Sequence, residues 1–238
     1  MAAAASAALL TSLVITSPGH AATEIGARTS SAEQVITVTV PSRRSTVGIL
    51  EAWKLRADGK YRRVLGPVTA YVGAEGIGKA SEYRSRTPRG VFTVTEAFGR
   101  RSNPGARLPY RQLGPYDWWV SDVDSPAYNT MQTCAPGTCR FSTGDSEHLS
   151  TISLYDYALV IDYNRDPVVP GAGSAFFLHV SAGEPTQGCV SVSRSAMRKL
   201  LRWLKPSLDP VISIGVGDKA YAPLSMEEIN AEFAAVNR

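Results

Sequence analysis

Short segments rich in β-branched residues recur along the chain, separated by glycine, proline, asparagine and aspartate. The clearest is QVITVTV at residues 34–40, where apolar and polar side chains alternate with the two-residue period of a strand. Further strands are predicted at residues 46–55, 63–72, 90–97, 158–163, 175–180 and 211–214. So many short strands predict a mainly β protein, built as a sandwich or barrel rather than as a βαβ fold.

Two segments carry a helical pattern. Ser193 can cap a helix over residues 194–204, and Pro206 ends it. Its apolar positions follow the i, i+3, i+4, i+7 spacing of one face and are Met197, Leu200, Leu201 and Leu204. Ser225 with Glu228 forms a capping box for a second, peripheral helix in a C-terminal tail at residues 216–238.

The N-terminal 22 residues carry no charge, stay apolar through Ile15 and then turn to small residues. This pattern is typical of a secretory signal peptide, although the usual basic start is missing, and an alanine-rich disordered tail is the alternative. We expect export to the cell wall or periplasmic space, with a short segment at residues 23–34 before the folded domain. After the leader no apolar run approaches the ~20 residues of a membrane span, so an internal span is excluded.

The chain has 3 cysteines. Cys134 and Cys139 bracket the turn-forming residues Ala-Pro-Gly-Thr, and in an oxidising compartment this spacing predicts a local disulfide. A zinc site is the rival interpretation, but no second cysteine pair or His-x3-His follows. Pairing these two cysteines leaves Cys189 as an unpaired thiol.

Composition and charge limit the classes of protein to which the chain can belong and the partners it can bind. With 44% hydrophobic and 19% charged residues, the chain is globular rather than disordered or coiled-coil. Residues 42–111 hold 15 Lys/Arg against 5 Asp/Glu, whereas residues 112–238 hold 9 against 14. The basic half favours an anionic cell-wall polymer over nucleic acid as a partner, and an ordinary charged surface explains it equally well. No phosphate-loop glycines and no dense histidine or carboxylate cluster are present, so we expect neither a cofactor nor a metal.

Residues 117–150 form a long stretch with little regular pattern. A connection of this length is either an insertion packed by its aromatic residues and disulfide or a functional lid. Trp118, Trp119 and Tyr128 are the aromatic residues that would form such a lid.

The candidate chemistry lies in residues 174–192. The strand at 175–180 brings His179 near its end, and Gly188 and Cys189 open the next extended segment ten residues later, so His179 and Cys189 can lie side by side. A cysteine attacks as the thiolate and needs an adjacent base at neutral pH. A buried, inert cysteine beside a core histidine is the alternative. Gly188, without a Cβ, would let a substrate carbonyl approach the backbone, whose neighbouring N–H groups can stabilise an oxyanion.

Several motifs resemble one enzyme family. Thr186-Gln187-Gly188-Cys189 matches three of the four positions of its Ser/Thr-His-Gly-Cys nucleophile motif, and residues 87–92, TPRGVF, resemble its Thr-Pro-x-Gly-x-Phe element. Supporting matches are Val72-Gly73, Asn129, Tyr163-Asn164 and the segment 173–179. Over residues 35–215 the sequence resembles the L,D-transpeptidase catalytic domain (YkuD-like) family, in particular its secreted actinobacterial-type members. The resemblance implies a YkuD-like β-sandwich or barrel with a helix after the nucleophile strand.

The resemblance also implies a mechanism. His179 would deprotonate Cys189, which would attack the carbonyl between a diamino acid and D-Ala in a peptidoglycan stem peptide, releasing D-Ala and leaving a thioester. The amine of a second stem peptide would then resolve the thioester and complete the cross-link. A backbone carbonyl or the Ser181 hydroxyl would orient His179, and the backbone around Gly188 would bind the oxyanion.

Candidate substrate-binding residues follow from the same resemblance: Thr186, Gln187, Asn164, Tyr128 and Arg194. Two positions depart from the family pattern. Gln187 replaces the usual histidine, and Ser191 stands where many relatives carry Arg or Asn, which leaves a substrate carboxylate to Arg194 or to an arginine of the first half.

Two other functions stay open at this point. Water in place of the amine would make the protein an L,D-carboxypeptidase, and an inert Cys189 would make it a non-catalytic wall-binding module. Sortases and papain-like wall peptidases are disfavoured by the spacing and the order of the histidine and the cysteine.

Overall fold

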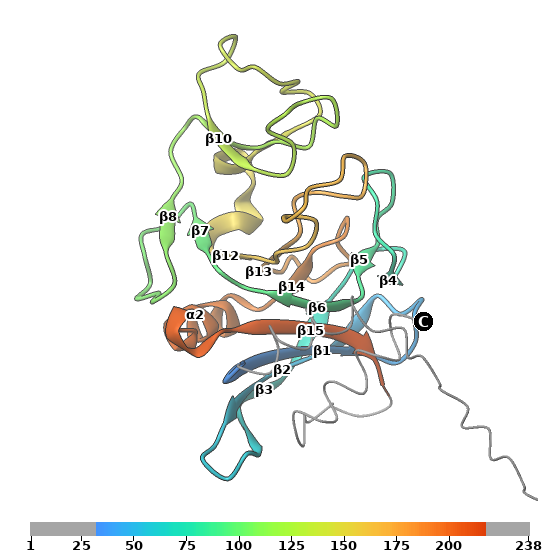
Figure 1. Cartoon of the computed structure of the whole chain (residues 1–238), viewed down its shortest axis with the longest axis vertical. Helices are drawn as coiled ribbons and strands as arrows, with labels where there is room; N and C mark the ends of the chain where they lie inside the picture. The colour runs from blue at the N-terminus through green and yellow to red at the C-terminus, as the bar shows by residue number, and fades with distance from the viewer. Residues whose placement is uncertain (1–31, 218–238) are drawn as a thin grey trace, which may run out of the picture.

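The computed structural model of the chain describes residues 32–217 (Figure 1). The predicted signal peptide and the predicted helix after Ser225 lie outside these residues. The element order is mainly β, as predicted, with one α-helix and three short 3-10 helices in the described part.

A ten-stranded sheet dominates the molecule. In sheet order its strands are β6 (Gly90–Thr93), β15 (Val211–Val216), β1 (Gln34–Val40), β2 (Val47–Leu55), β3 (Tyr61–Tyr71), β14 (Val190–Val192), β13 (Phe177–Val180), β12 (Ala158–Val160), β7 (Ala97–Gly99) and β8 (Tyr110–Gln112). Strand β1 lies between β15, which is parallel to it, and β2, which is antiparallel. Strands β3 and β14 then join this half to the strands that carry the predicted chemistry. A small pair, β4 (Ile77–Gly78) and β5 (Thr87–Pro88), stands apart from the large sheet.

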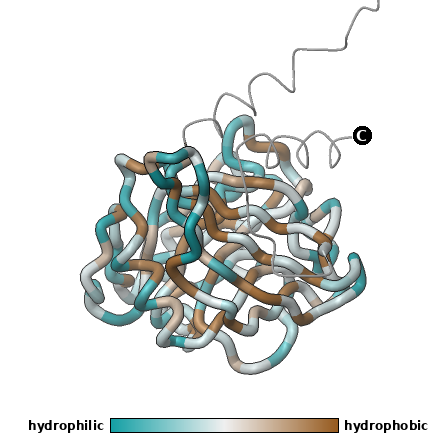
Figure 2. The backbone as a smooth tube through the Cα atoms, turned by 90° about the horizontal axis from the view of Figure 1, so that it is seen from below, coloured by the Kyte–Doolittle hydropathy of each residue, from teal (hydrophilic) through white to brown (hydrophobic). Residues whose placement is uncertain are grey.

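The main hydrophobic core lies between the sheet and helix α2 (Arg194–Trp203). The Ser193 hydroxyl accepts a hydrogen bond from the Ala196 N–H and so caps the helix as predicted. The four apolar side chains predicted on one face are all buried. Figure 2 shows hydrophobic residues concentrated along the inner strands and hydrophilic ones in the outer loops. No helix in residues 32–217 is both long and apolar enough to cross a bilayer.

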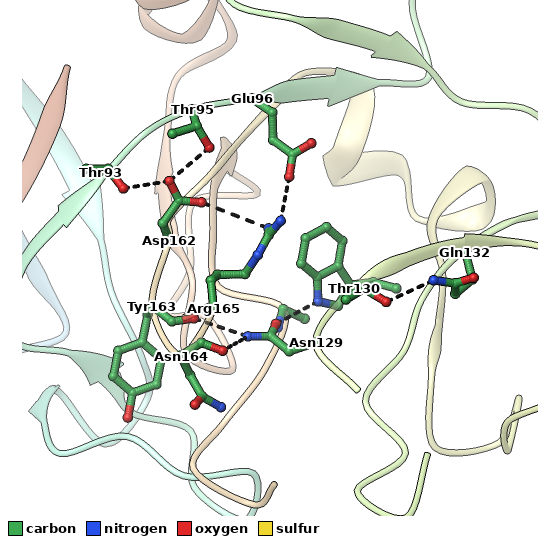
Figure 3. A network of polar contacts seen from close by, with 12 residues as sticks. Thr93, Thr95, Glu96, Asn129, Thr130, Gln132, Asp162, Tyr163, Asn164 and Arg165 are labelled. Atoms are coloured by element: carbon green, nitrogen blue, oxygen red, sulfur yellow. Dashed lines mark hydrogen bonds and ion pairs between the residues drawn. The ribbon is translucent and has the colours of Figure 1, made fainter. Parts of the chain in front are cut away.

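The prediction of a single strand at residues 90–97 is wrong. The segment divides into β6, which pairs with β15, and β7, which pairs with β12 and β8 in the other half of the sheet. Between them the hydroxyls of Thr93 and Thr95 both donate to the Asp162 carboxylate, at 2.7 and 2.9 Å (Figure 3). The chain therefore crosses from one half of the sheet to the other within a sequence whose periodicity is uninterrupted.

Residues 117–150 form a packed insertion. Strands β9 (Asp117–Trp119), β10 (Met131–Thr133) and β11 (Glu147–His148) make a three-stranded sheet with β9 in the middle. Cys134 and Cys139 form the predicted disulfide. Trp118 stacks on His148 with ring centroids 4.2 Å apart, and Trp119 is buried against Phe177. Both indoles are therefore core side chains, and the lid interpretation is not supported.

A second hydrophobic cluster joins this insertion to the sheet. It contains Phe98, Trp119, Leu149, Tyr155, Ala158, Val160, Ala175 and Phe177, with Cys189 packed against it. Two 3-10 helices, Leu149–Thr151 and Ser153–Asp156, supply Leu149 and Tyr155 to this cluster. The insertion thus forms one wall around the unpaired cysteine.

Candidate active site

His179 and Cys189 lie on neighbouring strands, as their spacing predicts. Strands β13 and β14 are parallel partners, with His179 opposite Ser191 and Leu178 opposite Val190. The connection between them passes beside the end of β3, where Thr186 forms a bridge with Gly73. Cys189 therefore lies next to Phe177, two residues along the chain from Ser191, the register partner of His179.

The Cys189 thiol borders a cavity of about 110 Å³. The cavity is lined by Ser81, Glu82, Arg84, Ser121, Glu147, Ser174, Ala175, Phe176, Gln187, Gly188 and Cys189. The sulfur accepts a hydrogen bond from the Phe177 N–H at 3.4 Å and donates one to the Ala175 carbonyl at 3.3 Å. A small ligand in this cavity would meet the sulfur directly.

The environment of Cys189 keeps the thiol protonated. Burial raises the pKa of Cys189, and the negative charge of Glu147 raises it further. The Phe177 N–H and the Tyr155 hydroxyl act in the opposite direction, because each stabilises the thiolate by hydrogen bonding. Burial is the largest of these effects, so the thiol is neutral when the cavity holds no substrate.

His179 is held as a neutral imidazole. Its Nδ1–H donates to the Val180 carbonyl at 2.9 Å, which leaves Nε2 without a hydrogen and able to accept a proton. Burial lowers the pKa of His179, although the bond to Val180 opposes this. Of the two predicted orienting groups, the structure therefore selects the backbone carbonyl, since the Ser181 hydroxyl accepts from the Gly183 N–H instead. Within residues 32–217 no hydrogen bond joins His179 to Cys189.

The turn before Cys189 is held by threonine hydroxyls. Thr186 accepts from the Gly188 N–H at 3.1 Å and donates to the Cys189 carbonyl at 2.6 Å. Thr87, which is fully buried, donates to the same carbonyl at 3.1 Å and accepts from the Gly73 N–H at 2.8 Å. The structure therefore places Thr186 in the framework of the turn. It also commits the Gly188 N–H to Thr186, so this group is not free for an oxyanion as the sequence suggested.

The backbone conformation at position 188 and the nearby Phe176 ring both require a glycine there. The φ of Gly188 is 143°, in a region that side-chain-bearing residues rarely adopt. A Cβ at this position would lie 2.8 Å from the Phe176 ring. The glycine thus allows the Phe176 ring to pack beside the turn that precedes Cys189.

The remaining predicted site residues divide into two groups. Gln187 is exposed and lines the cavity. Arg194 does not line it, because its guanidinium is bound to the buried Asp156 carboxylate at 2.6 Å. Arg84, an arginine of the first half of the chain, lines the cavity instead.

Tyr128 and Asn164 serve the framework of the site. Tyr128 is buried, donates its hydroxyl hydrogen to Glu82 and accepts from the Gly173 N–H at 3.1 Å. The Asn164 amide donates to the carbonyls of Val169 and Gly173, both at 2.9 Å. Neither side chain lines the cavity. Figure 3 shows Asn164 beside Asn129, whose amide holds the Asn164 carbonyl.

Sequence reasoning missed the two carboxylates of the cavity. Glu82 accepts from the Ser174 hydroxyl at 3.0 Å and also from Tyr128. Glu147 accepts from the Tyr155 hydroxyl at 2.6 Å. Burial raises the pKa of Glu147 to about 7, and the nearby charge of Glu82 adds to this. Both glutamates lie far from Cys189 in sequence and in no recognisable motif, so no local pattern pointed to them.

The arrangement can support acyl transfer through a thioester. It combines a thiol that borders a cavity, a neutral imidazole on the neighbouring strand and two carboxylates beside the thiol. Residues 32–217 contain no group of three His, Cys, Asp or Glu side chains that could hold a metal ion.

Comparison with known proteins gives one match. A search of curated proteins and a search of solved structures found none. A family model, described as the L,D-transpeptidase catalytic domain and called YkuD, matches residues 34–212. This range includes the cysteine, the histidine and the glutamates of the cavity, and the chain therefore belongs to the L,D-transpeptidase catalytic domain family.

Proposed function

We propose that this protein is a peptidoglycan L,D-transpeptidase that is acylated on Cys189 and transfers the acyl group to an amine. The observation that carries the proposal is the pairing of a thiol at a cavity with a neutral, oriented imidazole on the adjacent strand. Membership of the family supports the same class of chemistry and a peptidoglycan substrate.

In the first half-reaction Nε2 of His179 takes the thiol proton as Sγ of Cys189 attacks the carbonyl between the diamino acid and D-Ala. The C–N bond breaks, the D-Ala amine leaves with the proton from His179, and a thioester remains on the sulfur. Because burial keeps the thiol protonated, proton removal accompanies attack rather than preceding it. The Val180 carbonyl stabilises the imidazolium that forms in this step, because it holds the Nδ1–H.

In the second half-reaction the ammonium group of another stem peptide first gives one proton to a carboxylate of the cavity, and the neutral amine then attacks the thioester. The C–S bond breaks, and His179 takes a proton from the attacking nitrogen and passes it to the leaving sulfur, which restores the Cys189 thiol. The two carboxylates favour this acceptor over water. Glu82, and Glu147 above its pKa of about 7, give the wall of the Cys189 cavity negative charge, which attracts an ammonium group but has no such effect on neutral water.

We further propose that the protein acts outside the cytoplasm, at the cell wall, with stem peptides as donor and acceptor. The N-terminal sequence supports export. Anionic wall polymers are a second partner, and the hairpin formed by β2 and β3 offers a basic surface for them. Its exposed basic residues are Lys54, Arg56, Lys60, Arg62 and Arg63.

A second candidate function is a non-catalytic wall-binding module. The absence of a hydrogen bond between His179 and Cys189 in the described chain, together with the raised pKa of the thiol, favours it. An L,D-carboxypeptidase is the third, in which water resolves the thioester.

One experiment separates the three. The full chain is incubated with a purified disaccharide-tetrapeptide, and products and protein are read by mass spectrometry. We expect a cross-linked dimer, loss of D-Ala and a transient adduct on Cys189. Tripeptide alone would identify a carboxypeptidase, and unchanged peptide with no adduct would leave the binding module.

Variants at two positions provide the controls. Cys189→Ala and His179→Ala should each lower turnover by at least about 10³-fold, because each removes a group that acts as part of a unit. Cys189→Ser keeps the size and hydrogen bonding of the thiol and should be equally inactive. Folding of each variant is checked by circular dichroism, and substantial turnover in Cys189→Ala would refute the mechanism.

A further inference from the structure

One tyrosine links the cavity carboxylate Glu147 to the nucleophile. Tyr155 is buried, donates its hydroxyl hydrogen to Glu147 at 2.6 Å and belongs to the hydrophobic cluster against which Cys189 packs. Burial raises the pKa of Tyr155, and the nearby Glu147 and Cys189 raise it further. The Tyr155 ring packs edge-on against His179, with centroids 5.5 Å apart. Tyr155 therefore lies beside the carboxylate, the thiol and the imidazole.

The direction of the Tyr155 hydrogen bond decides whether the hydroxyl turns its hydrogen or its lone pairs toward the Cys189 thiol. A hydroxyl has one hydrogen, and in this structure Tyr155 gives it to Glu147. While the hydrogen stays on Glu147, only lone pairs remain to face Cys189, so the stabilisation that this hydroxyl can give a thiolate is available only when the hydrogen turns to the sulfur. The Ala175 carbonyl, at 3.3 Å from the sulfur, accepts from the thiol form alone.

The other charged groups around the cavity do not neutralise Glu147. Glu82 lines the same cavity, and its negative charge raises the pKa of Glu147 further. Arg84, on the same segment as Glu82, is ion-paired to Glu75 at 2.8 Å. His179 is neutral on its strand, and Tyr128 is hydrogen-bonded to Glu82. Among residues 32–217 Glu147 forms no ion pair.

We propose that Glu147, acting through the Tyr155 hydroxyl, is a positioning residue that controls whether the Cys189 thiol can ionise. With Glu147 charged, its negative charge and its hold on the tyrosine hydrogen both disfavour the thiolate. When Glu147 is neutralised, by a proton or by an ammonium group in the cavity, the hydroxyl hydrogen can turn to the sulfur. The second route rests on the proposed function, because an amine-bearing stem peptide would supply the ammonium group.

The test measures the free thiol without any peptide. The full chain is alkylated with iodoacetamide, a neutral reagent, from pH 6 to pH 10, and modification of Cys189 is followed by mass spectrometry. Above about pH 7, where Glu147 is charged, Glu147→Gln should be alkylated about tenfold faster than the unaltered protein, and the two rates should converge at pH 6. Glu147→Asp restores the charge and should return the pH–rate profile toward that of the unaltered protein.

A second variant separates this role from a structural one. Tyr155→Phe removes the hydroxyl whose hydrogen can turn to the sulfur. Added to Glu147→Gln, where Glu147 no longer holds that hydrogen as a carboxylate, it should therefore slow alkylation. If Glu147 and Tyr155 only held the packing together, both variants would expose the thiol and both would speed alkylation. Opposite directions for the two variants therefore support the proposal, and an alkylation rate above pH 7 that is unchanged or lower in Glu147→Gln overturns it.

Glu82→Gln removes a carboxylate of the same cavity that is hydrogen-bonded to Tyr128 and Ser174 rather than to Tyr155. It should speed alkylation less than Glu147→Gln, and an equal increase would overturn the role of Tyr155, because only the total charge of the cavity would then matter. Peptide turnover is measured separately. A shifted profile in a protein that does not process the tetrapeptide would refute the proposed function alone, whereas turnover with an unshifted profile would refute this inference alone.

Discussion

The substitution Gly188→Ala tests whether the Phe176 ring and the backbone conformation at residue 188 together determine the shape of the turn before Cys189. The added Cβ would lie 2.8 Å from the ring and 3.4 Å from the Arg86 carbonyl oxygen. The ring cannot withdraw freely, because it is buried and packs edge-on against Tyr163 at 5.1 Å. The variant therefore has to strain the backbone, displace the ring or shift Cys189.

The expected loss of stability can be divided into two parts. A non-glycine residue at this φ of 143° costs about 1–2 kcal/mol. Overpacking against a held aromatic ring costs about 1–3 kcal/mol more. The sum is about 3 kcal/mol, which corresponds to a fall of about 1.5 M in the urea midpoint for a slope of about 2 kcal/mol per M.

Gly183→Ala is the matched control. Gly183 also has a positive φ, 89°, but a Cβ there would have no atom within 4 Å. It should cost about 1 kcal/mol, from the backbone alone. The assay is urea unfolding followed by circular dichroism on both variants and the parent chain. Equal shifts in the two midpoints would refute the argument that Phe176 occupies the space beside Gly188.

Two further predictions concern the support of the site. Thr87→Val keeps the shape of a fully buried side chain but leaves the Gly73 N–H without its partner, so it should lower the free energy of unfolding by about 2 kcal/mol. The exposed Thr95→Val, whose acceptor Asp162 keeps a second hydroxyl donor in Thr93, should cost less than about 1 kcal/mol, and an equal loss would contradict the role of Thr87. Replacing Cys134 and Cys139 together by Ser should cost about 2 kcal/mol in thermal or urea unfolding, because the disulfide closes a short loop. The same protein under reducing conditions should match the double variant, and a difference between them would show that the serines act in some other way.

The structure shows contacts of Cys189 and His179 that the sequence alone did not predict. Cys189 and His179 are neighbours, but the sulfur is bonded to the backbone of the preceding strand and the imidazole to Val180. Glu147 and Tyr155 surround the thiol on the side of the insertion. Of the two interpretations of residues 117–150, the structure supports the packed insertion, and this insertion also contributes the Glu147 carboxylate to the cavity of Cys189.

Local sequence patterns determined several elements of secondary structure, the disulfide and the closeness of Cys189 to the strand of His179. The alternation in residues 34–40 gives the strand Gln34–Val40, and the apolar spacing after Ser193 gives the helix Arg194–Trp203. The turn between Cys134 and Cys139 brings the sulfurs together, and a ten-residue interval places Cys189 beside the strand of His179. Each of these features depends on residues close in sequence, whose periodicity and turn chemistry act over a few positions.

Only the tertiary structure decided which distant groups meet. The continuous pattern of residues 90–97 is divided between two halves of the sheet, because Val211–Val216 and Ala158–Val160 offer separate partners. Arg194 is bound by the buried Asp156 instead of reaching a substrate. Glu82 and Glu147 reach the cavity of Cys189 from segments with no motif. Such contacts are selected by packing and charge across the whole fold, and a side chain that is free in the local sequence can already be committed in the folded protein.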